Sequence, residues 1–231
     1  MTDGRAVEDL VVGVLGGTGP QGRGLGVRLA AAGQRVLLGS RDGDRARQVA
    51  EEVAGRAAAA AEGAEVSVTG GSNVDVAGAA DLVVVAVPLA GHAATLAELT
   101  KPLAGKVVVD CVVPMGFDEL GAYVLEVPEG SATQQAAGLL PDSSVVGAFH
   151  HVSAVLLQDV SRPTLDGDVM VVGDVREATD LVQALAGRIP GMRGIYAGRL
   201  RNAAQVEALT INLVSVNRRY KAHAGIRVTD V

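Results

Sequence analysis

Three glycines near the N-terminus have the spacing of a phosphate-binding turn. Gly17, Gly19 and Gly22 form a G-x-G-x-x-G pattern. In such a turn the first glycine permits a sharp bend, the second lets the backbone approach a pyrophosphate, and the third lets helix and strand pack closely. The helix that comes next directs free N–H groups and a partial positive charge at an anion. A glycine-rich chain can produce this pattern by chance, so the flanking elements decide its meaning.

The segments on either side of these glycines favour a binding site. Residues 11–15 form a short apolar run typical of a buried strand, and residues 22–32 place Leu25, Leu29 and Ala32 on one helical face. A strand, a glycine turn and a helix in this order predict a dinucleotide site. Its predicted contact residues are Gly17, Thr18, Gly19, Pro20, Gln21 and Gly22.

The end of the next predicted strand indicates which dinucleotide binds. In NAD enzymes an acidic side chain about 20 residues further on binds the ribose 2′-hydroxyl. This chain has Ser40 and Arg41 there, with no acid until Asp42. A serine hydroxyl and a planar guanidinium suit a 2′-phosphate, and Arg45 adds a second positive charge one helical turn later. We therefore expect NADP(H); the alternative is a solvated helix start with surface arginines.

A series of valine-rich runs predicts the sheet that carries this site. Runs without polar alternation are typical of strands covered on both faces, hence of a parallel sheet. The expected strands are residues 11–15, 35–39, 65–68, 82–87, 106–110 and 145–149, and helices are expected over 22–32, 43–61 and 91–100. With right-handed crossovers these elements predict an α/β, doubly wound Rossmann-type parallel sheet.

The second half of the chain is predicted to add a smaller C-terminal α/β portion. We expect helices over residues 132–140, 176–186 and 201–222 and a strand over 169–172. The last helix has one apolar face, formed by Val206, Leu209, Leu213, Val216 and Tyr220. We place the domain boundary near residue 150, so that residues 1–150 form the NADP-binding domain and residues 151–231 a small C-terminal domain.

Composition excludes several classes of protein. The 231 residues carry a formal net charge of −6, which argues against a general nucleic-acid binder. No apolar run approaches the roughly 18 residues of a membrane span, and residues 1–9 show no secretory signal, so no membrane partner is expected. The single cysteine, Cys111, fits a reducing cytoplasm.

The histidines are the remaining candidates for chemistry. His150 and His151 come after a predicted strand at its carboxyl end, where ligands bind in doubly wound folds. Adjacent strand residues point to opposite faces, so we expect at most one of them to face a cofactor and no metal site between them. His150 is a possible catalytic or ligand-binding residue, or a structural one. His92 and His223 are expected at the surface or at helix caps.

Taken in order along the chain, several motifs resemble the NADPH-dependent coenzyme F420 reductases (F420:NADP oxidoreductases). The more specific ones are Gly39-Ser40-Arg41 and the segment from Leu200 to Thr210. The others are Val14-Leu15-Gly16-Gly17-Thr18-Gly19, Val87-Pro88, Val113-Pro114, Ala148-Phe149-His150 and Ala197-Gly198-Arg199. The resemblance implies hydride exchange between NADPH and the deazaflavin coenzyme F420, in a small Rossmann protein that usually forms a homodimer. The sequence departs from the family's pattern at Pro20-Gln21 in the glycine turn and at His151 after His150. Both departures concern the fine positioning of the coenzymes and not the class of reaction.

The resemblance also assigns residues to the two coenzymes. Thr18, Ser40, Arg41 and Arg45 would hold the ribose phosphate of NADP. Val87, Pro88 and Leu89 would lie near the nicotinamide, and the C-terminal domain would close the deazaflavin cleft. On the last helix, Asn202 and Thr210 either line that cleft or are simply exposed polar residues.

Basic and acidic side chains are distributed unevenly along the sequence. Residues 183–231 contain eight basic side chains against two acidic ones. Since F420 carries a phosphate and a glutamate tail, this segment suits capture of an acidic ligand, or it forms an oligomer surface. Two other functions fit the first half of the chain: an NADP-dependent reductase of a small imine or hydroxy acid, and a non-catalytic NADP-sensing protein.

Overall fold

The computed structural model describes residues 5–61, 63 and 65–231, and the valine-rich runs form strands as predicted. The strands are β1 (Val11–Leu15), β2 (Arg35–Ser40), β3 (Ser67–Ser72), β4 (Leu82–Val85), β5 (Val107–Asp110), β6 (Met115–Asp118), β7 (Gly121–Val124), β8 (Ser144–Gly147), β9 (Gly167–Gly173) and β10 (Met192–Gly198). The α-helices are α1 (Pro20–Ala31), α2 (Gly43–Ala60), α3 (Asn73–Ala79), α4 (Leu89–Glu98), α5 (Thr100–Leu103), α6 (Ala132–Leu139), α7 (Ala154–Gln158), α8 (Arg176–Gly187) and α9 (Ala203–Tyr220). Two 3₁₀ turns are η1 (Val7–Asp9) and η2 (Leu200–Asn202).

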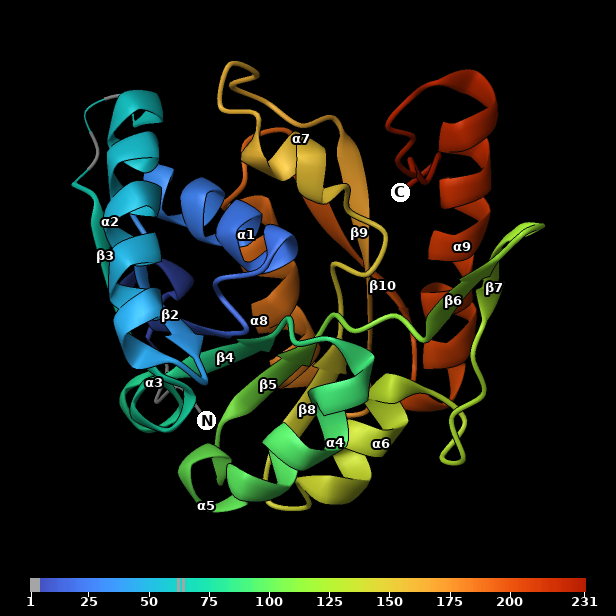
Figure 1. Ribbon diagram of the computed structural model, residues 1–231, viewed down its shortest axis with the longest axis horizontal. Helices are drawn as coiled ribbons and strands as arrows, with labels where there is room; N and C mark the ends of the chain where they lie inside the picture. Colours follow the sequence, from blue (N-terminus) through green and yellow to red (C-terminus); the bar gives the residue numbers. More distant parts are fainter. Residues whose placement is uncertain (1–4, 62, 64) are drawn as a thin grey trace.

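One twisted sheet runs through the molecule (Figure 1). Within the described residues it has eight strands in the order β10-β9-β8-β5-β4-β1-β2-β3. The strands from β8 to β3 are parallel to their neighbours, whereas β9 runs antiparallel to β8 and β10 runs parallel to β9. The order reverses at β1, which lies between β4 and β2 as a doubly wound fold requires. The predicted Rossmann-type sheet is therefore confirmed, with its last two strands inverted.

Helices cover both faces of the sheet (Figure 1). One buried cluster unites the sheet with α1, α2, α7 and α8 through apolar side chains that include Leu25, Val53, Leu157 and Leu185. The second cluster joins the opposite face to α3, α4, α5 and α6, with Val76, Leu96, Leu103 and Ala136 among its members. Small aliphatic residues fill both layers, as the near absence of aromatic residues predicts.

Several elements differ from the sequence prediction. Strand β3 begins at Ser67 and continues to Ser72, and its Gly70 packs where a side chain would meet the backbone of Ala46 in α2. The helices α3, α5 and α7, the hairpin β6–β7 and the strand β10 have no counterpart in the prediction. Each is short or interrupted by glycine, so periodicity gives little signal for it. Asp42 caps α2, because its carboxylate accepts hydrogen bonds from the backbone amides of Asp44 and Arg45 at 3.1 Å each.

The predicted apolar face of the last helix is buried only in its first half. Val206 is 3% exposed where α9 packs on β9, but Val216 is 37% and Tyr220 74% exposed. The second half of α9 extends beside the hairpin β6–β7 instead of over the sheet (Figure 1). No helix among the described residues is long and apolar enough to cross a membrane.

Candidate cofactor site

The glycine turn has the geometry expected of a phosphate-binding loop. Gly16 adopts a φ of 71°, and the amide of Gly17 donates to the carbonyl of Gly39 at 2.8 Å, which ties the turn to the end of β2. A Cβ atom on Gly22 would lie 2.7 Å from the Cα of Gly17, so only glycine lets α1 start this close to the loop. Gly19 is the N-cap of α1 and Pro20 its first residue. The free amides of that helix terminus therefore point at the loop.

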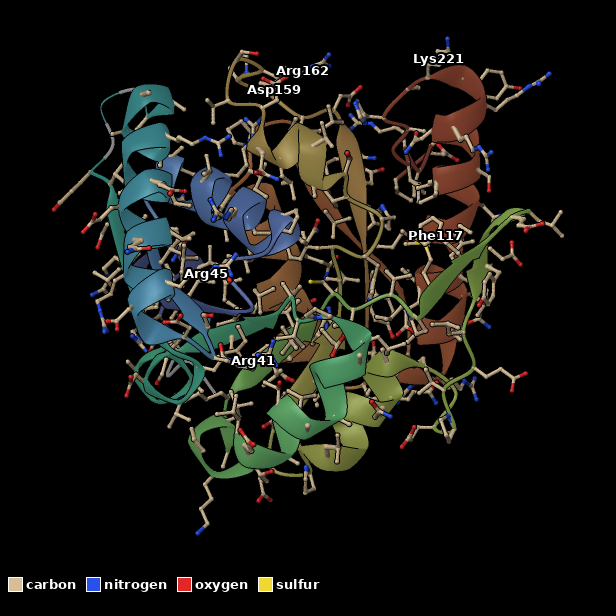
Figure 2. The ribbon with its side chains drawn as sticks, viewed as in Figure 1. Arg41, Arg45, Phe117, Asp159, Arg162 and Lys221 are labelled. Atoms are coloured by element: carbon tan, nitrogen blue, oxygen red, sulfur yellow. The ribbon has the colours of Figure 1, made fainter. Side chains whose placement is uncertain are left out.

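A cavity of ≈ 910 Å³ opens in front of this turn, and we call it the glycine-loop cavity. It brings together most of the residues predicted to bind NADP: Thr18, Gly19, Pro20, Gln21, Ser40, Arg41, Arg45, Val87 and Pro88. Arg41 and Arg45 are exposed beside the start of α2, and within the described residues neither forms an ion pair (Figure 2). Two guanidinium groups without anionic partners at one end of a cavity suit a phosphate. Gly17 and Gly22 shape the turn from behind.

One residue of this cavity, Asn73, is not among the predicted site residues. It is 9% exposed, begins α3, and its Oδ1 atom has no hydrogen-bond partner among the described residues. The side chain packs so closely on Gly39 that a Cβ atom there would lie 2.7 Å from the same oxygen. A buried acceptor without a partner costs about 1–3 kcal/mol, so a ligand donor would relieve it. No sequence signal marks Asn73, because α3 itself is not predicted.

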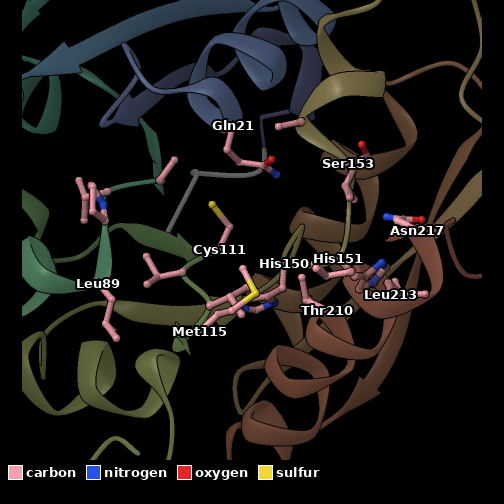
Figure 3. Close-up of a pocket in the computed structure, with 18 of the residues that line it drawn as sticks. Gln21, Leu89, Cys111, Met115, His150, His151, Ser153, Thr210, Leu213 and Asn217 are labelled. Atoms are coloured by element: carbon pink, nitrogen blue, oxygen red, sulfur yellow. The ribbon is translucent and has the colours of Figure 1, made fainter. Parts of the chain in front are cut away.

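A second cavity, which we call the central cavity, has a volume of ≈ 430 Å³ (Figure 3). Gln21, Ala86, Val87 and Pro88 line both this cavity and the glycine-loop cavity, so the two cavities adjoin at these residues. The amide of Gln21 donates to the carbonyl of Phe149 at 3.2 Å and links the two sides of the junction. The junction lies beyond the carboxyl ends of β1 and β4, where the strand order reverses and ligands bind in open α/β sheets.

The central cavity draws on both halves of the chain. The predicted residues Leu89, His150 and Thr210 line it together with aliphatic side chains of α9 such as Leu213 (Figure 3). Two of its polar atoms, His150 Nδ1 and Thr210 Oγ1, are buried without a hydrogen-bond partner among the described residues. Asn202 lines neither cavity. It lies at the N-cap position of α9, where its backbone amide donates a hydrogen bond to the carbonyl of Arg199.

Both adjacent histidines line the central cavity, so the expectation that at most one would face it is wrong. The physical reason is that β8 ends at Gly147, and Phe149 adopts a φ of 62°. His150 and His151 therefore lie in a turn rather than on a strand, and each is 5% exposed. Burial lowers the pKa of each imidazole to about 4, which keeps both rings neutral at neutral pH. His151 Nε2 accepts a hydrogen bond from the amide of Met170 at 3.2 Å.

His92 is also buried, contrary to the expectation of a surface residue. It has no exposed area, and its Nε2 lies 2.5 Å from Asp110 Oδ2 while its Nδ1 contacts Gln135 Oε1 at 3.0 Å. Burial alone would lower the pKa of His92, but the hydrogen bond to Asp110 and the charge of that carboxylate raise it above its usual value. The pair anchors the first turn of α4 to the end of β5, next to Pro88 and Leu89.

The basic C-terminal side chains serve several different purposes. Arg193 forms a bidentate ion pair with the buried carboxylate of Asp168, with both N–O distances 2.7 Å, and Arg227 forms a second ion pair with the same carboxylate. Arg218 and Arg219 instead line a groove of ≈ 410 Å³ between α9 and the hairpin β6–β7, and within the described residues they form no ion pair. Val214 lines both this groove and the central cavity. Among the described residues no three His, Cys, Asp or Glu side chains group as metal ligands.

Several known proteins match this chain along nearly the whole of both sequences. A family model described as NADP oxidoreductase, coenzyme F420-dependent, matches residues 11–114. The F420-dependent NADP reductase of Methanothermobacter thermautotrophicus is 39% identical over 228 residues, which covers 95% of each chain. The F420-dependent NADP reductase of Methanocaldococcus jannaschii is 34% identical, covering 95% of this chain and 98% of its own.

Solved structures agree with the sequence relatives. A protein from Arthrobacter sp. FB24, provisionally assigned as an F420-dependent NADP reductase, superposes with a TM-score of 0.75 at 25% identity and covers 94% of this chain and 98% of its own. A pyrroline-5-carboxylate reductase from Coxiella burnetii shares the fold with a TM-score of 0.60 at 16% identity, and only 66% of that chain is matched. With a glycine turn, a serine–arginine strand end and a match along nearly its whole length, the chain belongs to the family of F420-dependent NADP reductases.

Proposed function

We propose that this chain catalyses reversible hydride transfer between NADPH and the deazaflavin coenzyme F420. The observation that carries the proposal is a pair of cavities that share one wall, formed by Gln21, Val87 and Pro88. One cavity has the amides and arginines that suit a phosphorylated dinucleotide, and the other has aliphatic walls and unpartnered polar atoms. Family membership supports the same two coenzymes.

NADP(H) is assigned to the glycine-loop cavity. Its diphosphate would lie at the N-terminus of α1, against Thr18, Gly19, Pro20 and Gln21, because free amides favour an anion there. The ribose phosphate would be held by Ser40, Arg41 and Arg45. The wall residues Val87 and Pro88, with Leu89, would flank the nicotinamide at the entrance of the central cavity.

F420 is assigned to the central cavity. The nicotinamide supplies a hydride from its C4 atom, and the deazaflavin accepts it at C5 together with a proton at a ring nitrogen. The task of the chain is therefore to bind the two rings close together, orient them and exclude water. Aliphatic side chains such as Val112 and Leu213 provide dry walls, and His150 and Thr210 provide polar contacts.

The anionic tail of F420 is assigned to the groove lined by Arg218 and Arg219. The groove adjoins the central cavity through Val214, and within the described residues its two guanidinium groups form no ion pair. This assignment gives a function to part of the basic C-terminal segment. It also gives residues 151–231 their proposed role as the domain that closes the deazaflavin cleft, with a boundary near residue 150 after β8.

The two other functions receive less support. Reductases of small imines share the fold, but about a third of the matched pyrroline-5-carboxylate reductase lies outside the region that aligns with this chain. An NADP-sensing protein would need only the glycine-loop cavity, whereas this chain also builds the central cavity from the segment after β5, the turn after β8, and α9.

A spectroscopic experiment tests the proposed function. The protein is mixed with NADPH and oxidised F420, and loss of the visible deazaflavin band is measured over a broad pH range. We expect rapid bleaching with NADPH, slow bleaching with NADH, and recovery of the band when F420H₂ is mixed with NADP⁺. Absence of bleaching at every pH would refute the proposal.

A homodimer and a cytoplasmic location complete the proposal. The hairpin β6–β7 projects from the body of the molecule and exposes Phe117 by 66%, Leu120 by 95% and Val124 by 55%, an apolar surface that a second copy would cover (Figure 1). Sedimentation should give twice the 23.4 kDa of one chain, and Val124→Asp, at a hairpin residue that does not line the groove, should shift it toward the monomer. The single cysteine, Cys111, is free and buried, which suits a reducing compartment.

A further inference from the structure

A buried carboxylate lies behind the cavity-lining histidine. Glu207 of α9 is 2% exposed and accepts three hydrogen bonds from the start of α6. Its Oε2 accepts a hydrogen bond from the backbone amide of Ala132 at 3.0 Å. Its Oε1 accepts one from the backbone amide of Thr133 at 3.0 Å and one from the Thr133 hydroxyl at 2.8 Å. Burial, with a contribution from the charge of Asp110, raises the pKa of Glu207 above its usual value, and these donors oppose the shift. Three donors directed at one carboxyl group favour its anionic form.

The Thr133 hydroxyl connects this carboxylate to His150. Thr133 has no exposed area, and its Oγ1 lies 3.4 Å from His150 Nε2. A hydroxyl carries a single hydrogen, and in this position it is donated to Glu207, since an anionic carboxylate can only accept. The hydroxyl can therefore only accept from the imidazole, which requires the hydrogen of the neutral ring to be on Nε2.

The other ring nitrogen then has no hydrogen. His150 Nδ1 is buried and has no partner among the described residues, although the ring lines the central cavity. In the tautomer set by Thr133, Nδ1 is a hydrogen-bond acceptor. An acceptor left without a donor is costly in a buried site, so it favours a ligand that offers an N–H group.

We propose that Glu207 is a positioning residue which, through Thr133, holds His150 in the Nε2–H tautomer, so that Nδ1 presents an acceptor to an N–H group of the redox ring bound in the central cavity. The proposal rests on the proposed function only for the identity of that ring. Both rings of that reaction carry such donors: the carboxamide of nicotinamide, and the ring nitrogens of a reduced deazaflavin.

The same arrangement can stabilise a proton taken up by His150. A proton accepted at Nδ1 makes an imidazolium whose Nε2–H still donates to Thr133, and Glu207 stabilises the positive charge through that hydroxyl. When the proton returns to the ligand nitrogen, the ring reverts to the neutral Nε2–H form. The other titratable neighbours that act on His150 are Asp110 on β5, which favours the charged ring, and His151, which disfavours it.

A purely structural role for Glu207, capping α6, is the competing explanation. It requires only the two backbone amides of Ala132 and Thr133. The chain offers a matched pair of variants that separates the two roles. Thr133→Val removes the hydroxyl while keeping the backbone amide and the side-chain shape, and Thr133→Ser keeps the hydroxyl.

The direct test is the tautomer of His150 in the full-length protein without coenzymes. Long-range ¹H–¹⁵N spectra of ¹⁵N-labelled protein distinguish protonated from unprotonated ring nitrogens, and His150→Gln assigns the signal among the four histidines. We expect the Nε2–H tautomer in the wild type and in Thr133→Ser, and a shift toward Nδ1–H in Thr133→Val. A wild-type Nδ1–H tautomer, or an unchanged tautomer in Thr133→Val, overturns the proposal.

Kinetics give a second readout. For F420H₂ oxidation, Thr133→Val should lower kcat by about tenfold or more and leave the KM for NADP⁺ within about twofold. The acidic limb of its pH profile should move to lower pH, because the imidazolium loses its link to Glu207, whereas Thr133→Ser should restore the wild-type profile. A lowered kcat with an unmoved limb in Thr133→Val contradicts the proposal. Since the spectra need no deazaflavin, their result is independent of whether F420 proves to be the substrate.

Discussion

The two cavities that share the wall at Val87 and Pro88 are built in opposite ways. The glycine-loop cavity takes most of its binding groups from two short segments, residues 16–21 and 40–45, and its arginines are exposed. The central cavity gathers single side chains from distant parts of the chain, among them Gln21, His150 and Thr210, and two of its polar atoms, His150 Nδ1 and Thr210 Oγ1, are buried. The first is thus a backbone site that local sequence specifies, and the second is a side-chain site that only the tertiary fold assembles.

The largest effect is expected from a substitution that displaces the glycine turn of the backbone site. A Cβ atom on Gly22 would lie 2.7 Å from Gly17 Cα and 2.8 Å from Gly16 O, so Gly22→Ala must displace the loop. We expect the KM for NADPH to rise by at least about a hundredfold, since misplacement of about 1 Å has effects of that size. Gly55→Ala in α2 is the matched control, because a Cβ atom there has no neighbour within 4 Å. A normal KM in Gly22→Ala would remove the loop from the NADP site.

The next largest effect is expected on the preference for NADPH over NADH. Replacing Arg41 and Arg45 by alanine should raise the KM for NADPH by roughly ten- to a hundredfold, the range of one or two charge-assisted hydrogen bonds. The KM for NADH should change little, because NADH lacks the 2′-phosphate. Arg47→Ala is the control, since Arg47 pairs with Asp44 and does not line the cavity. Equal effects on NADPH and NADH would contradict the assignment of the phosphate to these arginines.

A smaller effect is expected where the central cavity continues into the groove. Arg218→Glu should raise the KM for F420 several-fold at low salt, because it places a negative charge beside the anionic tail. A deazaflavin without phosphate and glutamate should be unaffected. Arg201→Glu is the control, since Arg201 is exposed and lines neither cavity nor the groove. If both variants respond alike, the tail binds elsewhere.

The last prediction concerns the pH dependence of stability around the buried side-chain site. Burial lowers the pKa of His151 from 6.5 to about 4, so the unfolded chain binds this proton first as the pH falls. The stabilisation from the neutral buried ring is present above pH 6.5 and is lost as the pH falls toward 4, a change of roughly 3 kcal/mol at most. Urea unfolding of the wild type should show this loss together with a similar one from His150, and His151→Gln should remove only the part that is due to His151. Parallel pH dependences in the two proteins would count against a buried neutral His151.

The same contrast explains which features the sequence predicts. The glycine turn, Ser40, Arg41 and Arg45 can be placed because their roles depend on neighbours within a few residues. The burial of His92 cannot, since it depends on Asp110 and Gln135 from two later elements. Asn73 gives no signal for a similar reason, because its unpartnered oxygen is defined by Gly39 on a neighbouring strand. The rule for alternating strand residues does not hold at His150 and His151, because β8 ends earlier than its apolar run.

The last strand of the sheet has a consequence for association between chains. Strand β10 is an edge strand, and its pairing with β9 shifts register between Tyr196 and Gly198, so its outer backbone does not form a regular ladder. Irregular edges of this kind resist the addition of a strand from another molecule and so protect against aggregation. A second copy of the chain is therefore expected to dock on the apolar hairpin β6–β7 rather than to pair with β10.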